Sequence, residues 1–175
     1  MHALAALLLS MQGRGVAGVA LMAPETPVVR DAIRLLRQQG ISVVSIVSDL
    51  PNSDRDHFVG IDSRAAGRTA GVLMGRFLGG AASRVMVVAR SMLLRESIER
   101  RHGFDEVMLR DFPRIEVLQT IETHGSAEIL RQAVDESFRN FRDIGGIYLL
   151  GSGHRALQQA LSDLGLTGRN VIIGH

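Results

Sequence analysis

The chain has 175 residues, 46% of them hydrophobic and 22% charged, which is the composition of an ordinary soluble globular protein. Its 20 basic residues are all arginine, they are spread among 18 acidic residues, and the formal net charge is +2. This pattern shows neither the basic cluster nor the recognition helix of a DNA-reading domain. No apolar run is long enough to cross a bilayer. The absence of cysteine excludes disulfides and thiol catalysis and fits a cytoplasmic location.

Apolar, β-branched segments alternate with amphipathic segments along the whole chain. The apolar segments predict strands at residues 18–22, 42–47, 58–61, 85–89, 116–121, 146–150 and 171–173. The amphipathic segments predict helices at residues 3–9, 26–39, 63–78, 94–110, 127–140 and 154–164. The strands lack strict alternation, which is typical of parallel strands buried on both faces. The predicted fold class is therefore α/β, with parallel sheets flanked by helices.

The segment HFVGIDSRAAGRTAGVLMGRF, residues 57–77, joins a predicted buried strand to a predicted helix. Asp62 stands where an acidic N-cap meets the positive end of that helix. Gly67, Gly71 and Gly75 recur every four residues, so one face of the helix has almost no side chains. Each glycine lowers helix stability, and close packing of that face against a sheet is the expected compensation.

Within this segment, VGIDSRAAGRTAGVLMGRFL resembles the part of LacI-type transcriptional repressors and periplasmic sugar-binding proteins in which the chain passes between lobes. The stretch GRGVAGVALMAPETPVVRDAIRLLRQQGISVVSIVSDLP resembles their first-lobe strand–helix–strand unit. SIERRHGFDEVM matches their R-x-x-G-F pattern, and VIIGH resembles a late second-lobe strand. The resemblance implies a two-lobed periplasmic-binding-protein-like fold, truncated at both ends. Residues 1–57 would be part of the N-terminal lobe and residues 58–175 most of the C-terminal lobe.

The same resemblance implies the effector-binding domain of a LacI-family regulator, with a sugar or small polar metabolite as effector. DNA would be bound through a helix-turn-helix head that this chain lacks, and residues 1–175 alone should not bind DNA specifically. A cytoplasmic homodimer without cofactor or membrane contact is expected. The apolar side of helix 26–39 (Val28, Val29, Ile33 and Leu36) is a candidate dimer surface.

Two other classes of protein are weighed against this interpretation. The alternative is the periplasmic sugar-binding protein of an ABC transporter, which would share the fold but is expected to carry a signal peptide and more lysine. A third hypothesis is that the protein is a small α/β enzyme. It is disfavoured because the sequence has no metal-ligand spacing among its histidines, no G-x-S-x-G elbow and no P-loop.

Candidate ligand residues follow the predicted strands, because open α/β sheets bind ligands beyond the carboxyl ends of their strands. Asp49 follows strand 42–47, where the resembled family places an acid that contacts sugar hydroxyls, although a turn aspartate before Pro51 fits equally well. Arg100 occupies the arginine of R-x-x-G-F, which reaches the sugar in that family. A guanidinium can fork to two adjacent hydroxyls. The alternative is a solvated arginine beside Arg101.

The remaining candidates are His124, Gly151 and Ser152. His124 stands where the resembled family often has an aromatic that stacks on the ligand ring, and an exposed loop histidine is the alternative. Gly151 and Ser152 replace the Asn-Asp pair that is common after this strand. The resulting Gly-Ser-Gly loop could offer backbone N–H groups to an anionic group, or it could be a plain turn. No metal site is predicted.

Overall fold

The computed structural model describes residues 2–79, 81 and 83–175. The chain divides into two compact units, Met1–Asp62 with Leu93–Glu96, and Ser63–Met92 with Ser97–His175. Each unit is built on its own parallel sheet, with three strands in the first and four in the second. No helix among the described residues combines the length and the apolar character needed to span a membrane.

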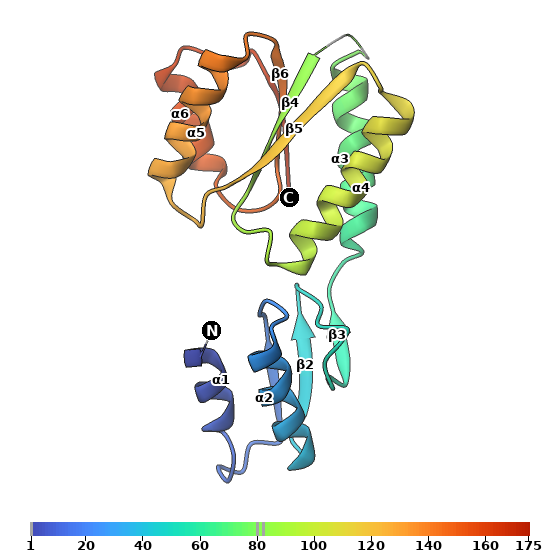
Figure 1. The fold of residues 1–175 in the computed structure, drawn as a ribbon, viewed down its shortest axis with the longest axis vertical. Coiled ribbons are helices and arrows are strands. Elements are labelled where there is room, and N and C mark those ends of the chain that lie inside the picture. The colour runs from blue at the N-terminus through green and yellow to red at the C-terminus, as the bar shows by residue number, and fades with distance from the viewer. Residues whose placement is uncertain (1, 80, 82) are drawn as a thin grey trace. The chain divides into compact units, whose positions relative to one another are not determined.

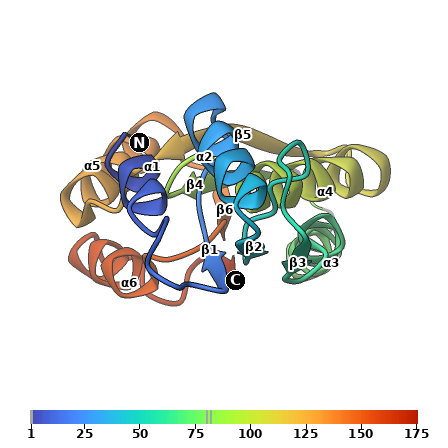
Figure 2. The same cartoon turned by 90° about the horizontal axis from the view of Figure 1, so that it is seen from below.

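The first unit contains two helices and three strands: α1 (His2–Leu9), β1 (Gly18–Leu21), α2 (Pro27–Gln38), β2 (Ser42–Ile46) and β3 (His57–Val59). The strand order is β1-β2-β3, and both pairs are parallel. Helix α2 begins where Pro27 occupies the first turn and the Thr26 hydroxyl accepts the Val29 N–H at 3.4 Å. Figure 2 shows α1 and α2 side by side on one face of the sheet.

The apolar side of α2 forms the core of this unit. Val29, Ile33 and Leu36 are completely buried, together with Val43 of β2 and Leu50. The prediction that this side of the helix is a dimer surface is therefore wrong, because its side chains are already used to cover the first sheet. A prediction of a homodimer has to rest on another surface.

The opposite face of the first sheet is open. The parallel register sets Val44 beside His57 and Ile46 beside Val59 on that face, and Ile46 and Val59 are 36% and 64% exposed. The expectation of strands buried on both faces is wrong for this sheet, since both helices pack on one side. The expected boundary between residues 57 and 58 falls inside β3, which pairs with β2, and the first unit continues to Asp62.

The second unit contains four helices and four strands: α3 (Ser63–Phe77), β4 (Ser83–Ala89), α4 (Arg95–Asp111), β5 (Ile115–Glu122), α5 (Ala127–Asn140), β6 (Ile144–Leu149), α6 (His154–Asp163) and β7 (Val171–Gly174). Its strands are all parallel in the order β5-β4-β6-β7. Figure 1 shows α3 and α4 on one face of this sheet and α5 and α6 on the other. The predicted helices and strands are confirmed in type and order, with ends that shift by one or two residues.

The central strand β4 is buried on both faces, as its apolar sequence predicts. Met86 and Val88 pack in the cluster that contains α5 and α6, whereas Val85, Val87 and Ala89 pack with α3 and α4. This alternation follows from the two-residue period of side chains along a strand. The core therefore has two layers, one on each side of the four-stranded sheet.

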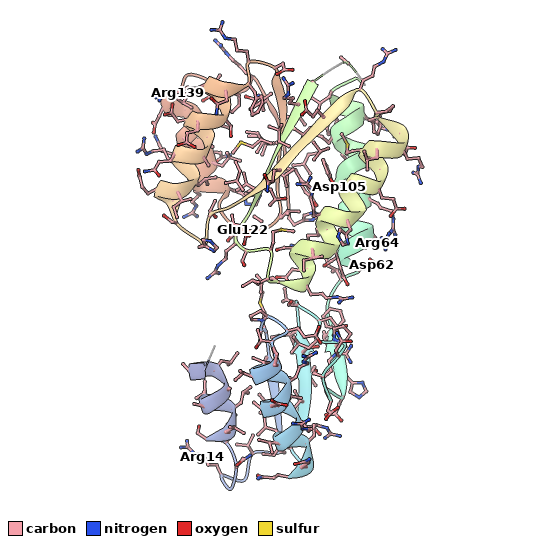
Figure 3. All side chains as sticks on the ribbon, in the orientation of Figure 1. Arg14, Asp62, Arg64, Asp105, Glu122 and Arg139 are labelled. Atoms are coloured by element: carbon pink, nitrogen blue, oxygen red, sulfur yellow. The ribbon has the colours of Figure 1, made fainter. Side chains whose placement is uncertain are left out.

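The glycine face of α3 packs against helix α4 and not against the sheet. A Cβ added at Gly67 would overlap the carbonyl oxygen of Arg100, and one added at Gly103 would overlap the carbonyl oxygen of Arg64. The sequence predicted the close approach correctly but assigned it to the wrong partner. An ion pair of 3.0 Å between Arg64 and Glu106 joins the same two helices. Asp62 directly precedes the first residue of α3 and so has the predicted N-cap position (Figure 3).

Candidate functional site

The carboxyl ends of the four parallel strands in the second unit meet at one edge of the sheet. Two of the loops that follow them carry predicted ligand residues: His124 follows β5, and Gly151 and Ser152 follow β6. His175 follows β7. Backbone hydrogen bonds of 2.9 Å from Thr123 to Ala89 and 2.8 Å from His124 to Arg90 continue the pairing of β5 with β4 past the strand ends. These hydrogen bonds fix the backbone of the loop that carries His124.

Arg100 on α4 reaches this edge. Its Nη1 atom donates to the carbonyl oxygen of Leu150, at 3.0 Å, just before Gly151. Its Nε atom is buried and has no acceptor among the described residues. A buried donor without a partner is unusual, so the guanidinium retains hydrogen-bonding capacity at the carboxyl edge. A half-buried arginine in this position is not a solvated surface charge, and its role in binding stays a prediction.

The neighbouring Arg101 instead forms contacts within the fold, with Asp105 and with strand β5. Its side chain is 15% exposed and pairs with Asp105 at 2.7 Å. Its Nη1 atom donates to the Leu118 carbonyl at 3.1 Å and to the Thr120 hydroxyl at 2.6 Å. Leu118 lies where β5 has one more residue than β4, since the register steps from Val117 to Thr120 against Val85 to Val87. Arg101 thus satisfies a carbonyl at a β-bulge.

Close packing of α3 and α4 sets the position of Arg100. The Arg100 carbonyl lies directly on Gly67, so the backbone that carries the guanidinium is fixed by a contact that only glycine allows. Phe104, one turn further along α4, is completely buried and stacks on Tyr148 of β6 with ring centroids 4.3 Å apart. These two contacts hold α4 to both α3 and the sheet.

Tyr148 and His175 contact each other at this edge, and the sequence interpretation did not identify either residue. The Tyr148 hydroxyl lies 2.9 Å from Nε2 of His175, and the two rings meet edge-on. Burial raises the pKa of Tyr148, so the phenol keeps its proton. Burial, and then the Arg100 charge, lower the pKa of His175, which favours the neutral imidazole. The signal available in the sequence was a single polar ring, the only tyrosine of the chain, inside the apolar run of β6.

The loops after β5 and β6 offer a ligand different groups, a side chain in the first and backbone N–H groups in the second. His124 is exposed and has a left-handed backbone with φ of 49°, directly before Gly125 at 82°. After β6, Ser152 is exposed, and Gly153 is the N-cap of α6 and provides no side-chain capping hydrogen bond. The first backbone N–H groups of α6 are therefore not satisfied by a capping side chain. Glu122 at the end of β5 (Figure 3) accepts the Met92 N–H at 2.8 Å and so fixes the loop after β4.

In the first unit, Asp49 is held by its own loop. Arg55 forks onto the carboxylate with distances of 2.5 and 2.8 Å, the Leu50 N–H donates at 2.7 Å and the Ser45 hydroxyl at 3.1 Å. The Arg55 hydrogen bond is the main cause that lowers the pKa of Asp49. These four donors use most of the accepting capacity of a carboxylate. The turn role is therefore observed, and a ligand role for Asp49 stays a prediction.

Val47, at the end of β2, has a backbone that valine rarely adopts. Its φ is 65°, and the Ser48 N–H donates to the Ile46 carbonyl at 2.7 Å, which closes a strained γ-turn around Val47. Ser48, directly after the turn, is completely buried, and its hydroxyl has no partner among the described residues. Backbone strain concentrates at functional sites, so the carboxyl end of β2 is the candidate region of the first unit.

The sequence was compared with models of known protein families and with curated proteins. The family model described as a periplasmic binding protein domain matches residues 3–175. No curated protein matches the chain.

Solved structures share the fold. A solute-binding protein of an ABC transporter from Burkholderia graminis, in complex with D-arabinose, has a TM-score of 0.91 at 23% identity over 98% of this chain and 60% of its own. A glucose-galactose binding protein from Geobacillus stearothermophilus has a TM-score of 0.84 at 21% identity, over 97% and 60%. An arabinose-binding protein from the same organism has a TM-score of 0.78 at 26% identity, over 97% and 58%. The chain thus spans about 60% of the length of these proteins.

Proposed function

The chain belongs to the periplasmic binding protein domain family, and we propose that it binds a monosaccharide or a similar small polar metabolite as part of the solute-binding component of an ABC transporter. The observation that carries the proposal is the position of Arg100, whose half-buried guanidinium lies at the carboxyl edge of the second sheet. Its buried Nε atom has no hydrogen-bond acceptor among the described residues. Sugar hydroxyls are the complementary acceptors, because adjacent hydroxyl oxygens match the fork of a guanidinium.

The names of the structural neighbours support this choice of ligand and of transporter. The Burkholderia protein is an ABC transporter solute-binding protein with bound D-arabinose, and the two Geobacillus proteins are described as sugar-binding proteins. Sugar binding by this chain is inferred from them by analogy of fold.

Calorimetric titration of the protein with D-arabinose, D-galactose and D-glucose tests the proposal. We expect one of the three to bind with a saturable heat and to raise the temperature of unfolding, since a ligand that binds only the folded state stabilises it. Absence of binding by all three at millimolar concentration would reject sugar binding of this class.

A second candidate is the effector domain of a LacI-type regulator. One observation favours it: all 20 basic residues are arginine, whereas the sequence interpretation expects lysine on a transport protein. Both candidates bind a sugar, so the titration does not separate them. Fractionation of cells that produce the full-length protein does, because a transport component is recovered with the periplasm and a regulator with the cytosol and with DNA.

A further inference from the structure

The hydroxyl of Tyr148 is a polar atom in an otherwise apolar place. Tyr148 is completely buried in the cluster shared by α3, α4 and the sheet, and its ring stacks on Phe104 at an interplanar angle of 22°. Phenylalanine would serve this packing equally well. The hydroxyl adds a group that must find a hydrogen-bond partner when buried, and its partner is Nε2 of His175 at 2.9 Å.

The direction of this hydrogen bond follows from the surroundings. The Tyr148 hydroxyl has no other acceptor among the described residues, so it donates its proton to Nε2 of His175. Nε2 is then the acceptor nitrogen of a neutral imidazole, and the ring proton sits on Nδ1. Because the two nitrogens of an imidazole point in diverging directions, Nδ1–H remains the free donor of His175, a residue with an exposed surface.

Arg100 belongs to the same group of residues. It donates to the carbonyl of Leu150, two residues beyond Tyr148, and Phe104 lies one helical turn after it on α4. The charge of Arg100 acts on both Tyr148 and His175. Two hydrogen-bond donors therefore lie at the carboxyl ends of β6 and β7: the guanidinium of Arg100, which α4 supplies, and the oriented imidazole of His175.

We propose that His175 is a second ligand-contacting donor beside Arg100, and that Tyr148 is the positioning residue that fixes its ring and its tautomer. The inference rests on the proposed function and deepens it. Two donors of this kind suit a neutral polyhydroxyl ligand whose ring or hydroxyl oxygens accept from both. Protonation of His175 removes the acceptor that Tyr148 uses and adds a charge next to Arg100, so binding should weaken as the pH falls.

The charged and titratable groups around His175 come from three elements. Arg100 lies on α4, Tyr148 on β6, and the imidazole of His154 on α6 packs against Gly174. Asp105 and Arg101 act on Tyr148 from α4. The positive charge of Arg100 acts on His175 and opposes protonation of its ring. We therefore expect the affinity to change at pH values below the ordinary histidine pKa of about 6.5.

Titration calorimetry between pH 5 and 8 tests the proposal, with whichever of D-arabinose, D-galactose and D-glucose the wild-type protein binds. The variants are Tyr148→Phe, which keeps the stack on Phe104, and His175→Phe, which removes the donor. His102→Phe is the matched control, since His102 is an exposed histidine on the same helix as Arg100. Imidazole ¹⁵N spectra of the same proteins report the tautomer and the titration of His175 without any sugar.

We expect His175→Phe to weaken binding about tenfold at pH 8 and to remove most of its loss toward pH 5. Tyr148→Phe should weaken binding several-fold and shift the His175 ring away from the Nδ1-protonated tautomer, while His102→Phe changes neither. Wild-type affinity and pH profile in both test variants would overturn the inference and leave the proposed function standing. Failure of the wild-type protein to bind any of the three sugars would overturn both.

Discussion

Gly67 of α3 lies against the backbone carbonyl of Arg100 of α4 so closely that no side chain fits between them. Gly103 has the same relationship to the carbonyl of Arg64 in the opposite direction. The pair of contacts is reciprocal, and it fixes the backbone of the helix that carries the candidate ligand residue. The close packing of α3 on α4 therefore also determines where the backbone of Arg100 lies.

Gly67→Ala should destabilise the second unit. The new Cβ overlaps a backbone oxygen, which cannot move away as a side chain can, and overpacking of this kind costs about 1–3 kcal/mol. The gain in helix propensity offsets about 1 kcal/mol of this. Gly71→Ala is the matched comparison, because its Cβ would lie 3.0 Å from the Cβ of Val107 and 3.2 Å from the Phe104 carbonyl oxygen, a tight contact and not the overlap found at Gly67. Urea unfolding that shows equal stability for both variants would contradict the packing described here.

Arg100→Lys and Arg100→Ala should both reduce the affinity for a bound sugar. Loss of a charged hydrogen-bonding group costs about 1.5–3 kcal/mol, which corresponds to about tenfold or more in the dissociation constant. Lysine keeps the charge but not the fork, so it should not restore binding. Arg139→Ala is the control, since that arginine is exposed on α5 (Figure 3). Calorimetry that finds wild-type affinity in both Arg100 variants would remove Arg100 from the site.

Val47→Asn should stabilise the first unit by about 1 kcal/mol. A backbone in a sparsely populated region costs about 1–3 kcal/mol. A positive φ is least suited to a β-branched residue, and asparagine adopts a positive φ more readily. Val59→Asn is the control, because Val59 is also exposed but lies in strand β3, where the substitution should not stabilise. Denaturant midpoints measure both changes. An unchanged or lower midpoint for Val47→Asn would mean that the γ-turn is not strained.

Asp49 should make the stability of the first unit sensitive to acid. Its pKa lies below the ordinary value of 3.8, chiefly because Arg55 bonds its carboxylate. Stability from the pair is therefore complete above about pH 4 and is lost as the pH falls through the folded-state pKa. Asp49→Asn should cost about 1.5–3 kcal/mol at pH 7 and flatten the loss of stability below pH 4.

Asp31→Asn provides the comparison for this measurement. Asp31 also pairs with an arginine, Arg34, but its side chain is 60% exposed, and exposed ion pairs contribute little. Its unfolding profile should follow the wild type at every pH. Identical profiles for Asp49→Asn and Asp31→Asn would show that the Asp49–Arg55 pair has no special role.

The sequence alone determined the alternation of helices and strands and their parallel arrangement. Apolar periodicity and capping residues are local signals, and they place every helix and strand to within one or two residues. It also determined that the glycines of α3 meet a close neighbour, and that Arg100 follows the motif of a ligand-binding family. These conclusions depend on residues a few positions apart, which share one element.

Only the tertiary structure decided which elements face each other. The glycine face of α3 met α4 and not a sheet, the apolar side of α2 became core, and one face of the first sheet stayed open. The pairing of Tyr148 with His175, 27 residues apart, was equally invisible in the sequence. Such contacts depend on how separate elements pack, and a local pattern specifies that an apolar or glycine-rich face must be covered without specifying by what.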